Sequence, residues 1–408
     1  LAIGILIMRP TLQMPSLTKF IDGTGPVWTG DLFPFLFITI ACGAVSGFHA
    51  LIASGTTPKM LANENQACFI GYGGMLMESF VAIMALVAAC VIDPGVYFAM
   101  NSPMAVLAPA GTVDVVASAA SVVSSWGFHI TPETLTNIAN EVGEQSIISR
   151  AGGAPTLAVG MAYILHGALG GLMDVSFWYH FAILFEALFI LTAVDAGTRA
   201  ARFMLQDLLG VISPSLKRTD SLPANLLATA LCVLAWGYFL HQGVVDPLGG
   251  INTLWPLFGI ANQMLAGMAL MLCAVVLFKM KKQKYAWVAL VPTAWLLFCT
   301  LTAGWQKAFS DNPKVGFLAI ANKFQAMLDS GNIPAQYTQS QLTQLVFNNR
   351  LDAGLTIFFM VVVVVIGLFA IKTARQALRS DTPTAKETPY QKMPEDVEQI
   401  VAQAKSAH

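Results

Sequence analysis

The residues best suited to chemistry lie in one short stretch, 43–59, which reads GAVSGFHALIASGTTPK. Gly55 and Pro58 both disfavour helix, so the stretch is expected to unwind within an otherwise apolar segment. A helix that unwinds in a membrane offers free backbone amides and carbonyls to a small ligand, and amides at a helix start favour a carboxylate. Lys59 and a protonated His49 would strengthen this preference. The stretch therefore predicts a site for a small anion.

The same stretch has a simpler interpretation. Gly43 and Gly47 are four residues apart, a spacing that lets two uninterrupted helices pack closely. A second segment, 254–263 (LWPLFGIANQ), favours unwinding, because Pro256 and Gly259 precede two adjacent side-chain amides. Two interrupted spans in one chain are typical of a transporter. The predicted substrate contacts are the polar and small residues of both segments: Ser46, Gly47, His49, Ser54, Gly55, Thr56, Thr57, Lys59, Asn262 and Gln263.

Ionisable side chains inside apolar segments are the next candidates. Each costs about 2.5–3.5 kcal/mol to insert and usually faces a cavity or a partner. Glu78 and Glu186 are predicted to carry a coupling proton, although Glu186 could instead be a buried hydrogen-bond partner and Glu78 lies in a more polar setting. Asp195 and Arg199, four apart on one helix face, are predicted to form a structural ion pair.

Composition assigns the chain to the membrane. Of its 408 residues, 56% are hydrophobic and 11% charged, whereas average soluble domains carry about 25% charged residues. The net charge of −1 gives no indication of a nucleic-acid partner. No HExxH, P-loop or GxSxG motif occurs, so no enzyme is predicted. The six cysteines contain no CxxC pair and indicate no metal site. No cofactor is expected; a proton is the predicted coupling ion, and sodium stays open.

The apolar residues form blocks of about 20, the length at which a helix crosses a bilayer. The chain is therefore predicted to be an all-α polytopic membrane protein, with a transmembrane domain over 1–380 and a soluble cytoplasmic tail over 381–408. A polar outer loop is expected over 305–350. The eight predicted spans lie near 32–54, 70–92, 155–173, 177–198, 222–241, 252–278, 285–304 and 352–371.

Lysine and arginine predict the orientation, because basic loops stay in the cytoplasm. Basic clusters follow the fourth, sixth and eighth predicted spans, at 199–218, 279–284 and 372–379. Strict alternation of eight spans then places 9–31 and 93–154 on the same, cytoplasmic side.

This topology puts His49, Lys59 and Glu78 in the outer half of the membrane. The region 93–154 leaves an alternative open. Its weakly apolar segment 113–126 could be a surface helix or an extra crossing, and an extra crossing would invert the first two spans.

Several runs of sequence resemble one known family. They are FLFITIACGAVSGFHALIASGTTPK (35–59), FIGYGGMLMESFVAIMALVA (69–88), RAGGAPTLAVGMA (150–162), FWYHFAILFEALFILTAVDAGTRAARFMLQDLLG (177–210), GVVDPLGGINTLWPLFGIANQMLA (243–266) and KETPY (386–390). The resemblance is to the carbon starvation protein A (CstA) family and covers nearly the whole chain. It implies a multi-pass transporter of the bacterial inner membrane, in the amino acid–polyamine–organocation group, with a LeuT-like fold. It supplies no residue-level site.

Members of the family are described as pyruvate:proton symporters induced under nutrient limitation and as peptide transporters. The resemblance thus implies proton-coupled uptake of pyruvate or a similar small carboxylate. A di- or tripeptide transporter is the first alternative, and a nutrient-sensing membrane receptor is the second. Family members usually carry an additional N-terminal half of several spans. Because the chain begins at Leu1 without a methionine, we expect it to be an internal piece whose partners include that half and the lipid bilayer.

Overall fold

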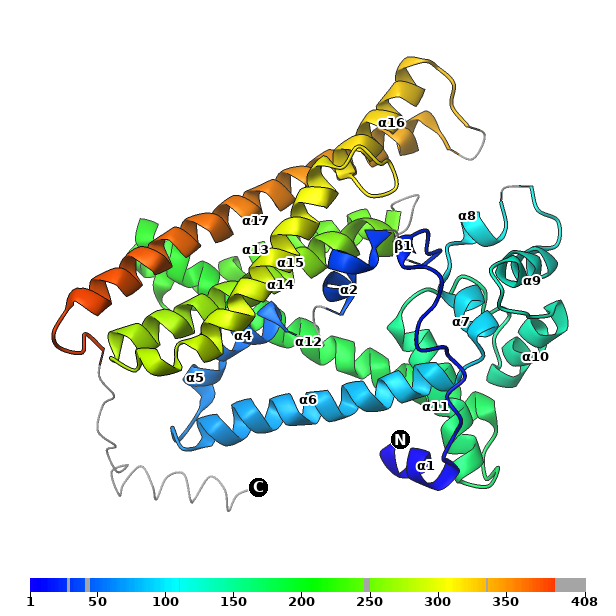
Figure 1. Cartoon of the computed structure of the whole chain (residues 1–408), viewed down its shortest axis with the longest axis horizontal. Helices are drawn as coiled ribbons and strands as arrows, with labels where there is room; N and C mark the ends of the chain where they lie inside the picture. Colours follow the sequence, from blue (N-terminus) through cyan, green and yellow to red (C-terminus); the bar gives the residue numbers. More distant parts are fainter. Residues whose placement is uncertain (28–29, 41–44, 110, 246–249, 335–336, 386–408) are drawn as a thin grey trace.

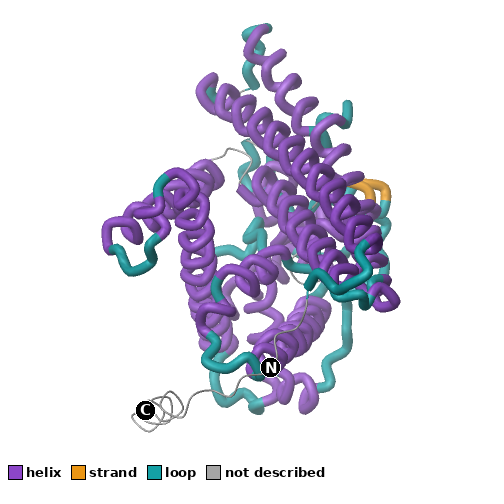
Figure 2. The backbone as a smooth tube through the Cα atoms, turned by 90° about the vertical axis from the view of Figure 1, so that its left-hand side faces the viewer, coloured by secondary structure: helices purple, strands orange, loops and turns teal. Residues whose placement is uncertain are grey.

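The structure is a computed structural model of the whole chain. It describes all residues except 28–29, 41–44, 110, 246–249, 335–336 and 386–408, and of 250–256 it describes only the backbone. Most of the predicted tail therefore lies outside the described residues. The described chain is mostly helical, and its strands are confined to a short antiparallel hairpin of β1 (Asp22–Gly23) and β2 (Gly30–Asp31) (Figure 2).

The helices are named here in chain order. The first helices in the chain are α1 (Ala2–Met8), α2 (Leu32–Thr39), α4 (Gly47–Gly55) and α5 (Thr57–Met60). Those of the middle are α6 (Gln66–Val91), α7 (Pro94–Asn101), α8 (Met104–Leu107), α9 (Val115–Ser125), α10 (Pro132–Val142) and α11 (Gly153–Ala168). The remainder are α12 (Val175–Ile212), η1 (Pro214–Lys217), α13 (Leu222–Val245), α14 (Gly250–Lys279), η2 (Gln283–Tyr285), α15 (Trp287–Phe309), α16 (Phe317–Asp329) and α17 (Gln339–Arg379).

Six of the described helices are long and apolar enough to cross a membrane: Gln66–Val91, Val175–Ile212, Leu222–Val245, Leu257–Lys279, Trp287–Phe309 and Gln339–Arg379. They correspond to the second predicted span and to the last five. The first predicted span is divided between α2 and α4. The third corresponds to α11, which has 16 residues. Such a helix is about 24 Å long, less than the roughly 30 Å of a bilayer core. Eight continuous spans are therefore not confirmed.

The residues between α6 and α11 form a compact lobe of short helices, α7–α10 (Figure 1). Its core contains an aromatic cluster in which Phe98 stacks on Phe128, with ring centroids 4.5 Å apart. Phe20 and Trp126 meet Phe98 edge-on. The predicted segment 113–126 becomes α9, whose 11 residues are about 16 Å long. The structure thus supports a surface helix here rather than an extra crossing.

Side-chain caps set where the lobe helices begin. Asp93 accepts a hydrogen bond from Gly95 N–H at 2.8 Å at the start of α7, and Asp114 accepts one from Ala117 N–H at 2.9 Å at the start of α9. Thr131 caps α10 in the same way. Each such cap stabilises its helix by about 1 kcal/mol. The caps supply hydrogen-bond acceptors for N–H groups in the first turn of each short helix.

The helices α2, α14, α15 and α17 share a buried core that includes Phe35, Ile38, Ile260 and Met264. Gly259 permits this packing, because a Cβ at that position would lie 2.6 Å from the carbonyl oxygen of Ile38. The prediction that the sixth span is interrupted around 254–263 is wrong, since α14 continues from Gly250 to Lys279. Its glycine marks a close helix contact instead of a break.

The two halves of the divided span run in the same direction as α14. Ile38 of α2 lies against Gly259, and Gly47 of α4 lies further along α14, against Leu265. The C-terminal end of α4 therefore points toward Lys279, where α14 ends. Figure 1 shows α5 and the C-terminal ends of α14 and α17 at one end of the molecule, which we call the basic end, and the lobe at the other.

Lys59 lies at the basic end. Its Nζ is 4.2 Å from the ring centroid of Phe203 on α12, and a Cβ on Gly55 would lie 3.3 Å from Cε of Met204. The predicted placement of Lys59 on the side opposite the basic loop after α12 is therefore wrong. One crossing fewer between α4 and α12 is consistent with this placement, and α11, with 16 residues, is the shortest of the helices that match a predicted undivided span.

This arrangement predicts which introduced cysteines share a side of the membrane. In a cysteine-free background, Glu64→Cys after α5 and Gln283→Cys after α14 should be labelled from the same side by a membrane-impermeant maleimide. Ser330→Cys, between α16 and α17, should be labelled from the other side. All three side chains are exposed. Labelling of Glu64→Cys together with Ser330→Cys would restore the topology expected from eight strict crossings.

A second prediction concerns the contact of α11 with α6. A Cβ on Gly160 would lie 2.1 Å from the carbonyl oxygen of Ala88, so Gly160→Ala should force the helices apart and lower the free energy of unfolding by about 1–3 kcal/mol. Gly71→Ala in α6 is the matched control, because nothing lies within 4 Å of its Cβ position. Thermal unfolding of the purified protein in detergent measures both. Equal stability of the two variants would contradict the contact.

Candidate functional site

The predicted unwound span is divided between α2 and α4, but the predicted break at Gly55 and Pro58 is wrong, because α4 stays helical from Gly47 to Gly55 and the interruption precedes it. α2 ends at Thr39 and α4 begins at Gly47; residues 41–44 lie outside the described residues. Ser46 is extended, with φ −106° and ψ 116°, and its side chain accepts a hydrogen bond from His49 N–H at 3.1 Å. We call the described residues between the two helices, Ile40, Val45 and Ser46, the break. The first turn of α4 directs the positive end of its helix dipole there.

The break is held by two adjacent side-chain amides of α14. Oδ1 of Asn262 accepts a hydrogen bond from Phe48 N–H at 2.8 Å, at the start of α4. Nε2 of Gln263 donates to the carbonyl oxygen of Phe37, near the end of α2. Gly47 allows the approach, since a Cβ there would lie 2.1 Å from the carbonyl oxygen of Asn262. One turn of α14 therefore holds both sides of the break.

Each amide keeps one polar atom without a partner among the described residues. These atoms are Nδ2 of Asn262 and Oε1 of Gln263. Their side chains are buried, with exposed fractions of 3% and 1%. A donor and an acceptor are thus left over beside the break.

The structure also joins two ionisable residues that the sequence placed only at a similar depth. Nε2 of His49, on α4, lies 2.9 Å from Oε2 of Glu78, on α6. Both side chains are partly exposed, at 53% and 41%. Because charged groups inside a membrane face a cavity or another part of a protein rather than lipid, this pair marks a polar surface beside the break. A histidine and a carboxylate at this distance can share a proton.

The other predicted substrate contacts lie at the far end of α4. Gly55 is its last residue, and Thr57 begins α5. Nine residues of helix separate them from the break by about 13 Å. Ser54 donates to its own helix, and Lys59 is held over Phe203. Thr56 is buried, and its Oγ1 has no partner among the described residues. These residues are not brought together with Ser46, Gly47, His49 and the two amides.

α12 carries the remaining predicted residues. It packs on α4 at Gly197, where a Cβ would lie 3.0 Å from the ring of Phe48. Asp195 and Arg199 form an ion pair of 2.8 Å along the helix. Glu186 lies 11 positions before Gly197, about 16 Å along α12, so it is separated from the contact with α4 by three turns.

Comparison with known families decides what kind of chain carries this site. The family model described as carbon starvation protein CstA matches residues 1–303. That range includes the break, the His49–Glu78 pair and both amides of α14. This chain belongs to the CstA family. No solved structure matches it.

Several curated relatives cover nearly the whole chain. "Peptide transporter CstA" of Escherichia coli (strain K12) is 89% identical over all of this chain and 58% of its own length. "Pyruvate/proton symporter BtsT" of the same strain is 57% identical over 97% of this chain and 58% of its own length. "Peptide transporter CstA" of Helicobacter pylori (strain ATCC 700392 / 26695) is 49% identical over 96% of the chain and 57% of its own length. The chain spans less than two thirds of the length of each.

In this CstA-family chain, a second group of buried polar residues escaped the sequence analysis. Lys307 of α15 is 4% exposed, and its Nζ lies 5.2 Å from the ring centroid of Phe35 and 5.8 Å from that of Phe317. Asn348 and Asp352 of α17 are equally buried. The predicted outer loop 305–350 included Lys307 and Asn348, although both lie within long helices. The spacing of Asn348, Asp352 and Thr356 on one helix face was the available signal.

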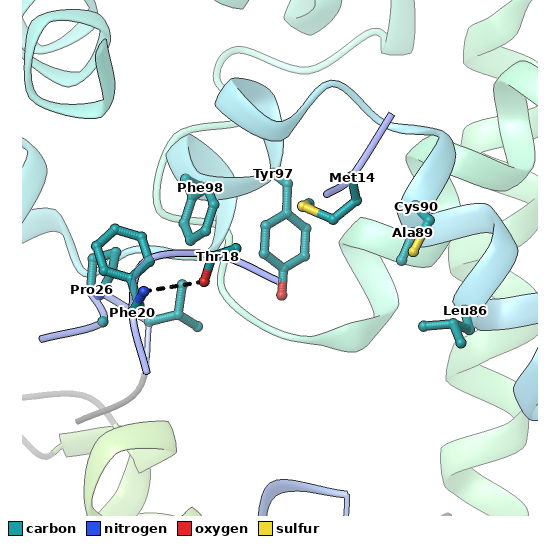
Figure 3. Close-up of a pocket in the computed structure, with 11 residues that line it drawn as sticks. Met14, Thr18, Phe20, Pro26, Leu86, Ala89, Cys90, Tyr97 and Phe98 are labelled. Atoms are coloured by element: carbon teal, nitrogen blue, oxygen red, sulfur yellow. Dashed lines mark hydrogen bonds between the residues drawn. The ribbon is translucent and has the colours of Figure 1, made fainter. Parts of the chain in front are cut away.

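A cavity of about 370 Å³ lies between the N-terminal segment, α6 and α7, away from the break (Figure 3). Tyr97 and Phe98 come from α7, and Leu86, Ala89 and Cys90 come from α6. The lining is largely apolar. Within the part of the chain that the structure describes, no three His, Cys, Asp or Glu side chains are grouped as metal ligands.

The His49–Glu78 contact predicts non-additive substitutions. His49→Gln and Glu78→Gln should each lower the unfolding free energy slightly, and the double variant should cost no more than the larger single effect. Because both side chains are partly exposed, the coupling should stay within about 1 kcal/mol. Thermal unfolding of the four proteins measures it. Strictly additive losses would show that the two side chains do not interact.

Proposed function

We propose that this chain takes part in proton-coupled uptake of a small carboxylate across the bacterial inner membrane, within a carrier of LeuT-like fold. The observation that carries the proposal is the break, whose two sides are held by Asn262 and Gln263. Discontinuous helices of this kind bind substrates at the midplane of secondary transporters. The names of the relatives, a peptide transporter and a pyruvate/proton symporter, support the same class.

The substrate carboxylate would bind at the start of α4. The positive end of its helix dipole favours an anion there, although the N–H groups of Phe48 and His49 are already bonded to Asn262 and Ser46. His49 lies in this turn, with its backbone N–H bonded to Ser46. Pyruvate is one candidate substrate, because it is a small monocarboxylate and the relative named for pyruvate/proton symport is 57% identical.

The His49–Glu78 pair supplies a physical link between proton and substrate. At 2.9 Å, a protonated His49 is neutralised by Glu78 and has little attraction for a second anion. A proton bound by Glu78 releases the charge of His49 to the substrate carboxylate. One proton per monocarboxylate makes this movement electroneutral, and a second proton, on Glu186, would let the membrane potential drive uptake.

Short peptides are the second candidate substrate. The relative that is 89% identical is named a peptide transporter, and a peptide has a carboxylate for the start of α4. Its ammonium group also needs an acceptor. Glu78 could serve, but the ammonium group would have to compete with His49 for that carboxylate.

The orientation that fits uptake places the basic end in the cytoplasm. Lys59, Arg199, Lys281 and Arg379 all belong to segments at that end, and basic loops are retained in the cytoplasm. The lobe then lies outside. Alternating access would expose the break to each side of the membrane in turn, with the divided span and α14 moving as one unit.

Uptake of labelled pyruvate and of a labelled dipeptide into proteoliposomes that contain the complete protein tests this proposal. Uptake should require an inward proton gradient and collapse with an uncoupler, and replacing sodium by choline should leave it unchanged. Glu78→Gln and Glu186→Gln should each reduce gradient-driven accumulation at least about tenfold, equivalent to 1.4 kcal/mol. Asp195→Asn is the control carboxylate, since Asp195 pairs with Arg199 instead. Full accumulation by both glutamine variants would exclude this proton route.

A further inference from the structure

The orientations of the two α14 amides are determined by backbone partners. Phe48 N–H can only donate, so the atom of Asn262 that it contacts at 2.8 Å is the oxygen Oδ1. The carbonyl of Phe37 can only accept, so the atom of Gln263 that contacts it is the nitrogen Nε2. The usual ambiguity of side-chain amides is therefore resolved at both residues.

This assignment states which hydrogen-bonding atoms remain. Asn262 has a donor, Nδ2, and Gln263 has an acceptor, Oε1, and neither has a partner among the described residues. Both side chains are at least 97% buried. A buried polar atom left without a partner costs about 1–3 kcal/mol. A ligand at the break would recover this energy only if it offered an acceptor to Asn262 and a donor to Gln263.

Candidate substrates differ in this respect. Pyruvate has a carboxylate and a keto oxygen, which are acceptors only, so it could satisfy Nδ2 of Asn262 and would leave Oε1 of Gln263 unmatched. A peptide also has N–H groups. Sites that hydrogen-bond a polar group of their substrate reject analogues that lack the group, because the buried partner is then unpaired.

We propose that Asn262 and Gln263 form a selectivity pair, in which Nδ2 of Asn262 binds the substrate carboxylate or carbonyl and Oε1 of Gln263 accepts an N–H of the substrate. This inference rests on the proposed function and specifies its substrate class: carboxylates that also carry an N–H donor, with acceptor-only acids such as pyruvate bound more weakly. Each amide would then join one side of the break to one end of the ligand.

Two substitutions at Gln263 separate recognition from positioning. Gln263→Met keeps the length of the side chain but removes both the free acceptor and the donor to Phe37. Gln263→Glu also loses that donor, yet it keeps an acceptor for the ligand. If Gln263 acts only by holding α2, both variants should behave alike. If Oε1 contacts the substrate, only the methionine variant should lose selectivity for N–H donors.

Asn262→Asp tests the other atom. The carboxylate can still accept from Phe48 N–H, but it replaces the free donor with an acceptor and adds a negative charge. Affinity for alanyl-alanine and for pyruvate should both fall at least about tenfold, equivalent to 1.4 kcal/mol. Unchanged affinity for both ligands would remove Asn262 from the proposal.

The readout is the ratio of inhibition constants of unlabelled alanyl-alanine and pyruvate, measured on the complete protein in proteoliposomes. The dipeptide should be preferred about tenfold or more in the unsubstituted protein, as expected for about 1.4 kcal/mol. The ratio should approach one in Gln263→Met through weaker dipeptide binding, with pyruvate unchanged. It should persist in Gln263→Glu. Preference for pyruvate or an unchanged ratio in Gln263→Met would overturn the proposal.

Failure of the proposed function gives a different result. In that case neither ligand accumulates with a proton gradient, whatever the variant. The same ratio is then obtained from the rise in melting temperature that each ligand causes in detergent, which requires binding but no transport. Selective binding without accumulation would support the amide pair and reject the carrier. Accumulation without selectivity would support the carrier and reject the pair.

Discussion

The hydrogen bonds from one turn of α14 to the two sides of the break are the interactions on which the rest of this structure depends. A helix that stops inside a membrane leaves N–H and carbonyl groups without intrahelical partners, and hydrocarbon offers none. Asn262 accepts from the start of α4, and Gln263 donates to the end of α2. Two side chains thus compensate an interruption that would otherwise be too costly to retain.

Those hydrogen bonds require very close packing, which glycine provides. Gly47 and Gly259 lie where a Cβ would overlap the backbone of the opposite segment. The apolar core of Phe35, Ile38, Ile260 and Met264 then surrounds the contact. The two glycines and the large side chains around them therefore act together. The glycines bring the backbones within reach, and the large side chains exclude competing solvent.

The charged residues lie at three separate places in the structure. At the break, Nε2 of His49 lies 2.9 Å from Oε2 of Glu78, and both side chains remain partly exposed. Toward the start of α2, Lys307 is buried against Phe35, where it adds charge to the packing of α2 on α15. Nζ of Lys59 lies 4.2 Å from the ring centroid of Phe203 at the basic end.

The sequence by itself determined the membrane class, the apolar helices and the unusual character of 43–59, because composition and apolar block length respond directly to the bilayer. It also named Ser46, Gly47, His49, Glu78, Asn262 and Gln263. Only the tertiary structure decided that these residues meet while Lys59 and Thr57 do not. It also showed that the residues before α11 form a lobe, that α11 has 16 residues, and that α14 is continuous. The physical reason is that glycine marks a break and a close contact equally well, and that one miscounted crossing inverts every span before it.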